Sequence, residues 1–329
     1  MNLLARNAEQ FFWLGRYIER AASISRIIEI HSAHERGDDS DQAWSWLVAL
    51  YSDEEHFKKT HAEFSFKNVI RFYVRDAANP GSIASALRAA RENARALRAV
   101  IPTEMWNHLN EFYNRFMELD ETDLDLISLS RTCATIKNGC YAQLGVIEST
   151  LYRDEGERFF RLGLMIERAD QTSRLLDVKF AQLATRSSGN LDMADSTFWS
   201  LVLRSAAAYQ AFRRLERKSA DPASVARFLL LNPCHPKSVA CCAGEMQRVL
   251  QDLRSGYGLR QTSHALEKLD VLVDGLQHAS RDAALVARLH NVNDWLQLRL
   301  ADLTNELAIR FFGAAPPQLQ SQSQSQSVA

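Results

Sequence analysis

The chain has 329 residues, enough for one large domain or two ordinary ones. Its 39 Lys plus Arg and 40 Asp plus Glu give a net charge of -1, so no global electrostatic attraction to nucleic acid or an anionic membrane is expected. No apolar stretch predicts a membrane-spanning helix, and the first residues do not resemble a signal peptide, so we expect a cytoplasmic protein. The five cysteines match no common zinc or redox spacing and are expected to be free thiols.

Apolar residues recur with a 3.6-residue period along most of the chain, which predicts an all-α protein, a multi-helix bundle. No strand-turn-strand pattern competes with this prediction. The expected helices span residues 7–35, 41–51, 53–63, 66–75, 80–100, 102–119, 121–153, 155–185, 192–218, 221–231, 236–256, 259–277 and 281–312.

The first long helix carries the sequence FFWLGRYIERAASISRIIEI over residues 11–30. On a helical wheel its apolar residues form one stripe, beside which Gly15 permits close approach of a neighbouring helix. Glu19 and Arg26 lie at the edge of the stripe, two turns apart, whereas Arg20 is expected to point toward the polar face.

The helix expected at 80–100 follows the segment Asn-Pro-Gly-Ser, which ends at Ser82. Proline near a helix start is favourable, and the free backbone donors there can bind an anion. The helix carries a stripe of arginines interrupted by Glu92: Arg88, Arg91, Arg95 and Arg98. One interpretation is a solvated, salt-bridged face. The other is a site for phosphate, carboxylate or an acidic partner.

The helix expected at 155–185 repeats the first, because FFRLGLMIERADQTSRLLDV at residues 159–178 is identical to residues 11–30 at ten of twenty positions. Composition alone would give about one identity. Further matches downstream keep the same order, which indicates duplication of a helical unit. We therefore expect two diverged copies, about 1–150 and 151–312, related by a pseudo-twofold axis within one helical domain.

The residues after the last expected helix, 313–329, are rich in Gln and Ser and have little apolar surface to bury, so this tail is expected to be disordered.

The repeated motif places four charged residues, Glu19, Arg26, Glu167 and Arg174, at the edges of apolar stripes, where charges need close partners. We expect each glutamate to pair with Arg26 or Arg174, and Arg168, like Arg20, to point away. One hypothesis is a structural salt-bridge network. The other is a ligand site between the copies, where carboxylates and arginines hold an amino-acid or peptide head group.

Other cofactor signals are weak. His31 and His34 have a spacing compatible with a metal pair, but no third ligand is evident, so no metal site is predicted. Neither a Walker loop nor a dinucleotide-binding glycine motif is present, so no cofactor is expected.

Four segments resemble the alpha-E family, all-helical bacterial proteins named for a Glu-Arg motif. They are LGRYIERA at 14–21, NPGSIASALRAARENARALR at 79–98, TEMW at 103–106 and RDEGERFFRLGLMIERADQTSRLLDVK at 153–179. The resemblance covers nearly everything except the tail. Met165 departs from it, since the second motif often has Tyr there.

The resemblance implies partners rather than a reaction. Members occur beside, or fused to, circularly permuted ATP-grasp proteins, with transglutaminase-like cysteine peptidases and proteasome-like hydrolases as further associates. The implied process is synthesis or modification of a small peptide, in which ATP-grasp forms an amide bond. The family gives no catalytic residues to carry over.

Three hypotheses remain open at this point. The first is a non-catalytic partner that binds an ATP-grasp ligase or its peptide substrate. The second is an enzyme that uses Glu19 or Glu167 as acid or base. The third is a purely structural interaction module. A polar cavity between the copies would favour the first two, and a closed salt-bridge network the third.

Overall fold

The computed structural model describes residues 3–33, 44–186, 192–216, 220–282 and 284–313. These residues form helices and connections, with no strand among them, so the all-α prediction is confirmed. The expected tail falls on residues 314–329, which lie outside the described part. No helix in the described ranges combines the length and apolar character needed to cross a bilayer.

The order of elements in the second half follows that of the first. The first half contains α1 (Ala5–Ser32), α2 (Ser45–Tyr51), α3 (Glu54–Thr60), α4 (Phe66–Val74), α5 (Ile83–Ala96), α6 (Thr103–Met117), η1 (Thr122–Leu124) and α7 (Leu129–Thr150). The second contains α8 (Glu155–Arg186), α9 (Asp192–Ser205), α10 (Tyr209–Glu216), α11 (Pro222–Leu231), α12 (Val239–Ser255), α13 (Thr262–Arg281), η2 (Val286–Arg288), α14 (Leu289–Leu307) and η3 (Ala308–Phe312). The pseudo-twofold relation between the halves stays a prediction, which a superposition of the two would test.

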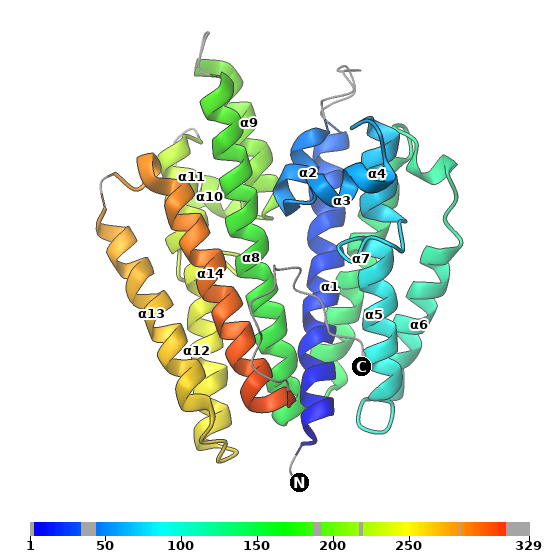
Figure 1. The fold of residues 1–329 in the computed structure, drawn as a ribbon, viewed down its shortest axis with the longest axis vertical. Coiled ribbons are helices and arrows are strands. Elements are labelled where there is room, and N and C mark those ends of the chain that lie inside the picture. Colours follow the sequence, from blue (N-terminus) through cyan, green and yellow to red (C-terminus); the bar gives the residue numbers. More distant parts are fainter. Residues whose placement is uncertain (1–2, 34–43, 187–191, 217–219, 283, 314–329) are drawn as a thin grey trace.

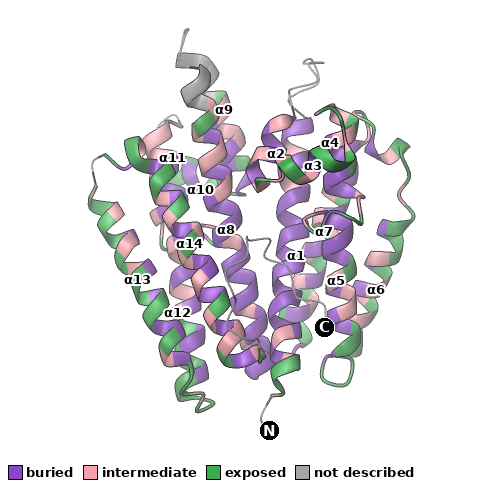
Figure 2. Ribbon diagram, viewed as in Figure 1, coloured by how far each residue is buried: buried purple, intermediate pink, exposed green. Residues whose placement is uncertain are grey.

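The two motif helices, α1 and α8, run side by side through the middle of the molecule (Figure 1). Helices α5 and α7 pack against α1, and α12 and α14 pack against α8. The short helices gather near one end of the bundle. Figure 2 shows α1 buried along most of its length, as expected of a helix enclosed by neighbours on several sides.

Glycine lets α1 and α8 touch backbone to backbone. A Cβ added at Gly15 would lie 2.3 Å from the carbonyl oxygen of Phe160, and one added at Gly163 would lie 1.9 Å from that of Phe12. These contacts are reciprocal, because each glycine meets the phenylalanine that precedes the other glycine by three residues. The close approach of a neighbouring helix expected at Gly15 is confirmed, and that neighbour is the second motif helix, α8.

Serine side chains cap the N-termini of α5 and α12, each of which follows a short helix. Ser82 and Ser238 accept hydrogen bonds from Ser85 N and Cys241 N at the beginnings of α5 and α12. The helix expected from residue 80 therefore begins only at Ile83.

Two expected helices are broken in the structure. The one expected at 192–218 is interrupted after α9, where Ala207 takes a left-handed φ of 57° and the N–H of Ala208 bonds back to Leu203 O. Ser52, at φ 56°, ends α2 in the same way. Neither position has the glycine that usually marks such an ending, so neither ending could be predicted from the residue types. The helix expected from 121 begins only at Leu129, after the η1 turn.

Candidate functional site: the crossed Glu-Arg network

Glu167 of α8 is fully buried and is held by arginines of α1. Arg16 Nε and Arg20 Nε each lie 2.7 Å from its carboxylate, and Gln171 Nε2 donates to it at 3.1 Å. Burial by itself raises the pKa of Glu167. Attraction and hydrogen bonds from Arg20 and Arg16 outweigh that effect and lower the pKa to about 2. The carboxylate is therefore ionised at neutral pH.

Glu19 of α1 is the counterpart and is also fully buried. It accepts from Arg168 Nε at 3.0 Å and from Lys237 Nζ, which comes from the connection before α12. Ser23 Oγ lies 3.4 Å from the same carboxylate. Burial raises the pKa of Glu19, but Lys237 and Arg168 together hold it below its ordinary value.

The prediction that Glu19 and Glu167 pair with Arg26 or Arg174 was wrong. Arg20 and Arg168, expected to point away, are the residues that cross between the helices and pair with Glu167 and Glu19. A helical wheel predicts which face of a helix is buried from the apolar stripe of that helix alone. Because α1 and α8 pack backbone to backbone, the face beside that stripe is buried too.

The residues expected to make those ion pairs have other partners. Arg26 donates from Nε to Tyr141 Oη at 3.2 Å, and Arg174 donates from Nε to Asp170 Oδ2 at 2.9 Å within α8. Both arginines are only partly exposed. Their Nε groups thus bond to Tyr141 and Asp170 rather than to Glu19 or Glu167.

Two of the cations that the sequence analysis missed differ between the copies. Arg16 occupies the position that Leu164 has in the second copy, and Lys237 the position that Gly81 has in the first. Glu167 thus pairs with Arg20 of the repeated motif and with Arg16, which only the first half has. Glu19 pairs with Arg168 of the repeated motif and with Lys237, which only the second half has. Their departure from the repeat is the feature of the sequence by which Arg16 and Lys237 could have been singled out.

A polar chain leads from the network toward the short helices. Tyr51 Oη donates to Gln171 Oε1 at 2.9 Å, and Gln171 in turn donates to Glu167. Nearby in the sequence, Tyr73 Oη donates to Asp53 Oδ2 at 3.0 Å. Burial raises the pKa of Asp53, an effect that the Tyr73 hydrogen bond opposes. The sequence analysis singled out none of these side chains.

Part of the positive charge of the α5 arginine stripe is neutralised by Glu92 of the same helix. Glu92 accepts from Arg91 and Arg95, while Arg91 also donates to Asn110 and lies over the rings of Trp106 and Tyr113. Arg91 is thus anchored between α5 and α6.

The three remaining arginines of the stripe, Arg88, Arg95 and Arg98, are exposed. Arg88 donates to Ala77 O, and Arg98 lies over Trp106. The salt-bridged interpretation holds for Arg91 and Arg95, which both pair with Glu92, while the guanidinium groups of Arg88, Arg95 and Arg98 still reach solvent.

At the helix start expected to bind an anion, the backbone donors of Gly81 and Ser85 already bond within the chain. Ser82 Oγ accepts from Ser85 N and donates to Asp76 O, and Gly81 N donates to Asn79 Oδ1. Ser82 is fully buried. Its oxygen therefore acts as a helix cap, which disfavours an anion at this position.

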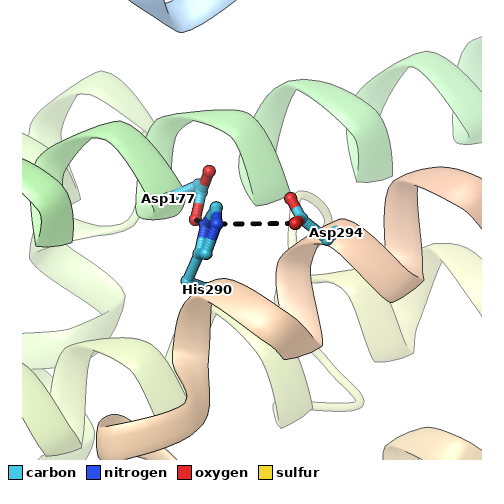
Figure 3. A group of neighbouring side chains, drawn as sticks. All are labelled: Asp177, His290 and Asp294. Carbon is cyan, nitrogen blue, oxygen red and sulfur yellow. Dashed lines mark hydrogen bonds and ion pairs between the residues drawn. The ribbon is translucent and has the colours of Figure 1, made fainter.

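Metal-type donors come together elsewhere. His31 is buried against Trp46, with ring centroids 4.3 Å apart, while His34 lies outside the described residues. Within the described residues, a group of three potential ligands from α8 and α14 is formed by Asp177, His290 and Asp294 (Figure 3).

A family profile, described as a predicted α-helical domain with a conserved ER motif, matches residues 3–312. The chain belongs to the Alpha-E family. Its two Glu-Arg dipeptides, Glu19-Arg20 and Glu167-Arg168, are crossed: the glutamate of each pairs with the arginine of the other. The Alpha-E motif of this chain thus joins its two halves. Neither the curated proteins nor the solved structures contain a match to it.

Proposed function

We propose that this Alpha-E chain is a non-catalytic helical partner in an ATP-grasp peptide-ligase system, where it binds the ligase or a small-peptide substrate. The association with ATP-grasp proteins and transglutaminase-like peptidases comes from the family resemblance. The observation that supports a non-catalytic role is the state of the motif glutamates, which are both fully buried and each held by two cations.

The alternative of an acid-base enzyme requires a carboxylate that exchanges protons and reaches a substrate. The lowered pKa values of Glu19 and Glu167 keep both groups ionised at neutral pH, so neither has a proton to donate. As bases they would have to leave two cations each and reach solvent. The network instead has the features of a structural joint.

Because the Glu-Arg network is buried and already paired, we place the proposed recognition surface on the exposed arginines of α5. Arg88, Arg95 and Arg98 present guanidinium groups on the first half, whereas the second half keeps only Arg254 at the matching positions. Guanidinium groups pair well with carboxylate or phosphate, so an acidic surface of the ligase, or an acidic peptide, fits this face.

The test is a pull-down of the cognate ATP-grasp protein that the family resemblance implies. We expect Arg95→Glu plus Arg98→Glu to weaken capture at least about tenfold, because charge reversal on one side of an electrostatic contact replaces attraction with repulsion. Capture by the wild type should also weaken with added salt, since exposed charges are screened over about 8 Å at physiological ionic strength.

The matched control is Arg248→Glu plus Arg254→Glu, on α12. Arg248 pairs with Glu245 three residues earlier, as Arg95 does with Glu92, so both double variants reverse two exposed arginines and remove one arginine partner from a glutamate. Circular dichroism checks that both are folded. Equal capture by the two double variants would reject the α5 face, and no capture by the wild type would reject the proposed function.

A further inference from the structure

Three potential ligands meet between α8 and α14. His290 and Asp294 are four residues apart on α14, so they share one face of that helix, and Asp177 approaches from α8 (Figure 3). His290 Nδ1 lies 2.8 Å from Asp177 Oδ1, and His290 Nε2 lies 3.5 Å from Asp294 Oδ2. All three donor atoms lie within 4.8 Å of one another.

Hydrogen bonding and attraction from Asp177, with attraction from Asp294, raise the pKa of His290, because a protonated imidazole donates to both carboxylates, whereas a neutral imidazole has a single N–H. The shorter contact assigns that N–H to Nδ1, which donates to Asp177. The lone pair of Nε2 then faces the negative charge of Asp294 at 3.5 Å. In this neutral form, a cation placed between Nε2 and Asp294 would bind both groups and relieve their repulsion.

The other half shows how the same contact is neutralised by the protein itself. Asp177 corresponds to Glu29 in the repeat, at the 148-residue spacing of the motif. Glu29 pairs with the ammonium of Lys137 on α7, a permanent positive charge between α1 and α7. Between α8 and α14, an imidazole and a second carboxylate make the contact in place of an ammonium.

We propose that Asp177, His290 and Asp294 form a binding site for a divalent transition metal of the Zn²⁺ class. His290 Nε2 and Asp294 are the direct ligands, and Asp177 orients the imidazole through Nδ1–H, as outer-shell carboxylates do in known zinc sites. Two ligands each about 2.1 Å from a tetrahedral zinc are about 3.4 Å apart. The Nε2 to Oδ2 distance of 3.5 Å fits this requirement.

The site is open enough for water to complete the coordination, since the His290 side chain is 71% exposed and that of Asp294 55%. The bound ion would join two side chains of α14, and Asp177 would hold the liganded imidazole against α8 through its hydrogen bond. The proposal does not depend on the proposed function, because it needs only these two helices.

The test is zinc titration of the metal-free full chain, by calorimetry near pH 7.5. The exposed thiol of Cys234 and the partly exposed thiol of Cys241 could also bind zinc, so both are first changed to Ser. In that background we expect one equivalent of Zn²⁺ to bind and to raise the melting temperature. Asp294→Asn and His290→Gln should abolish binding, and Asp177→Asn should weaken it about 10–100-fold.

The control is His264→Gln, which removes an exposed histidine that has one carboxylate neighbour, Glu267, and should leave binding unchanged. Circular dichroism of each metal-free variant establishes that it is folded. Absence of a bound equivalent in the parent protein would overturn the proposal. So would wild-type affinity in a folded Asp294→Asn or His290→Gln variant.

Discussion

At the residue scale, the crossed glutamates illustrate how a buried charge is tolerated. Removing a carboxylate from water is unfavourable by several kcal/mol, and only close, hydrogen-bonded cations offset this. Each of Glu19 and Glu167 has two such cations, at least one of them from the opposite motif helix. The loss of either carboxylate would leave buried positive charges without a partner.

Glu167→Gln should therefore destabilise the protein by roughly 3–5 kcal/mol, because Arg16 would remain fully buried without its counter-charge. The measurement is the free energy of unfolding from denaturant titration. The control is Glu111→Gln, an exposed carboxylate of α6, which should change stability by less than about 0.5 kcal/mol. Similar small effects of both substitutions would contradict a structural role for the network.

Protonation of Glu167 at low pH should lower the free energy of unfolding of the wild type. The pKa of Glu167 is lowered from 4.5 to about 2 in the folded protein, because Arg20 and Arg16 outweigh the effect of burial. A lowered carboxyl pKa gives stability that is present above about 4.5 and lost as the pH falls toward about 2. Unfolding free energies measured from neutral pH downward should thus fall less steeply in Glu167→Gln than in the wild type. Parallel curves would show that Glu167 does not contribute to acid unfolding.

At the element scale, the contact between α1 and α8 depends on two glycines. A methyl group at residue 15 would overlap the backbone of α8, which cannot move aside without separating the helices. Such a separation would also lengthen the ion pairs that cross between them. The glycine contact and the charge network are therefore expected to act together.

Gly15→Ala should destabilise the protein by roughly 1–3 kcal/mol, the usual range for overpacking a core. Gly244→Ala is the matched control, since a Cβ there meets no atom within 4 Å. In the middle of α12 it should stabilise by roughly 0.5–1 kcal/mol, because alanine favours helix more than glycine does. Thermal melts of the two variants should shift in opposite directions, and a stabilising effect of Gly15→Ala would refute the close contact.

At the scale of the whole molecule, the two halves share a charge network as well as an apolar core. Glu19 in the first half is neutralised by Arg168 and Lys237 of the second, and Glu167 by Arg16 and Arg20 of the first. Neither half can unfold alone without exposing the apolar face of the other and leaving its buried carboxylate without its counter-charges.

We therefore expect one cooperative unfolding transition. Far-ultraviolet circular dichroism and tryptophan fluorescence should give the same midpoint, since buried tryptophans occur in both halves, among them Trp13 and Trp199. Two resolved transitions would show that the copies are independent units.

The sequence by itself determined the helical class, the internal repeat and the presence of charged residues on core helices. These follow from local periodicity and from self-similarity, which need no knowledge of neighbours. Helix endings were harder, because Ser52 and Ala207 adopt left-handed conformations without a glycine to signal them.

Only the tertiary structure decided which charges pair. A helical wheel orders the side chains around one axis, and on that basis the sequence analysis predicts Arg26 or Arg174 as the partner of Glu19. The partners come instead from across the interface, because Gly15 and Gly163 bring two backbones together and bury a face that each helix alone would leave to solvent. Lys237, in a connection more than 200 residues from Glu19, reaches it only because the folded chain places them together.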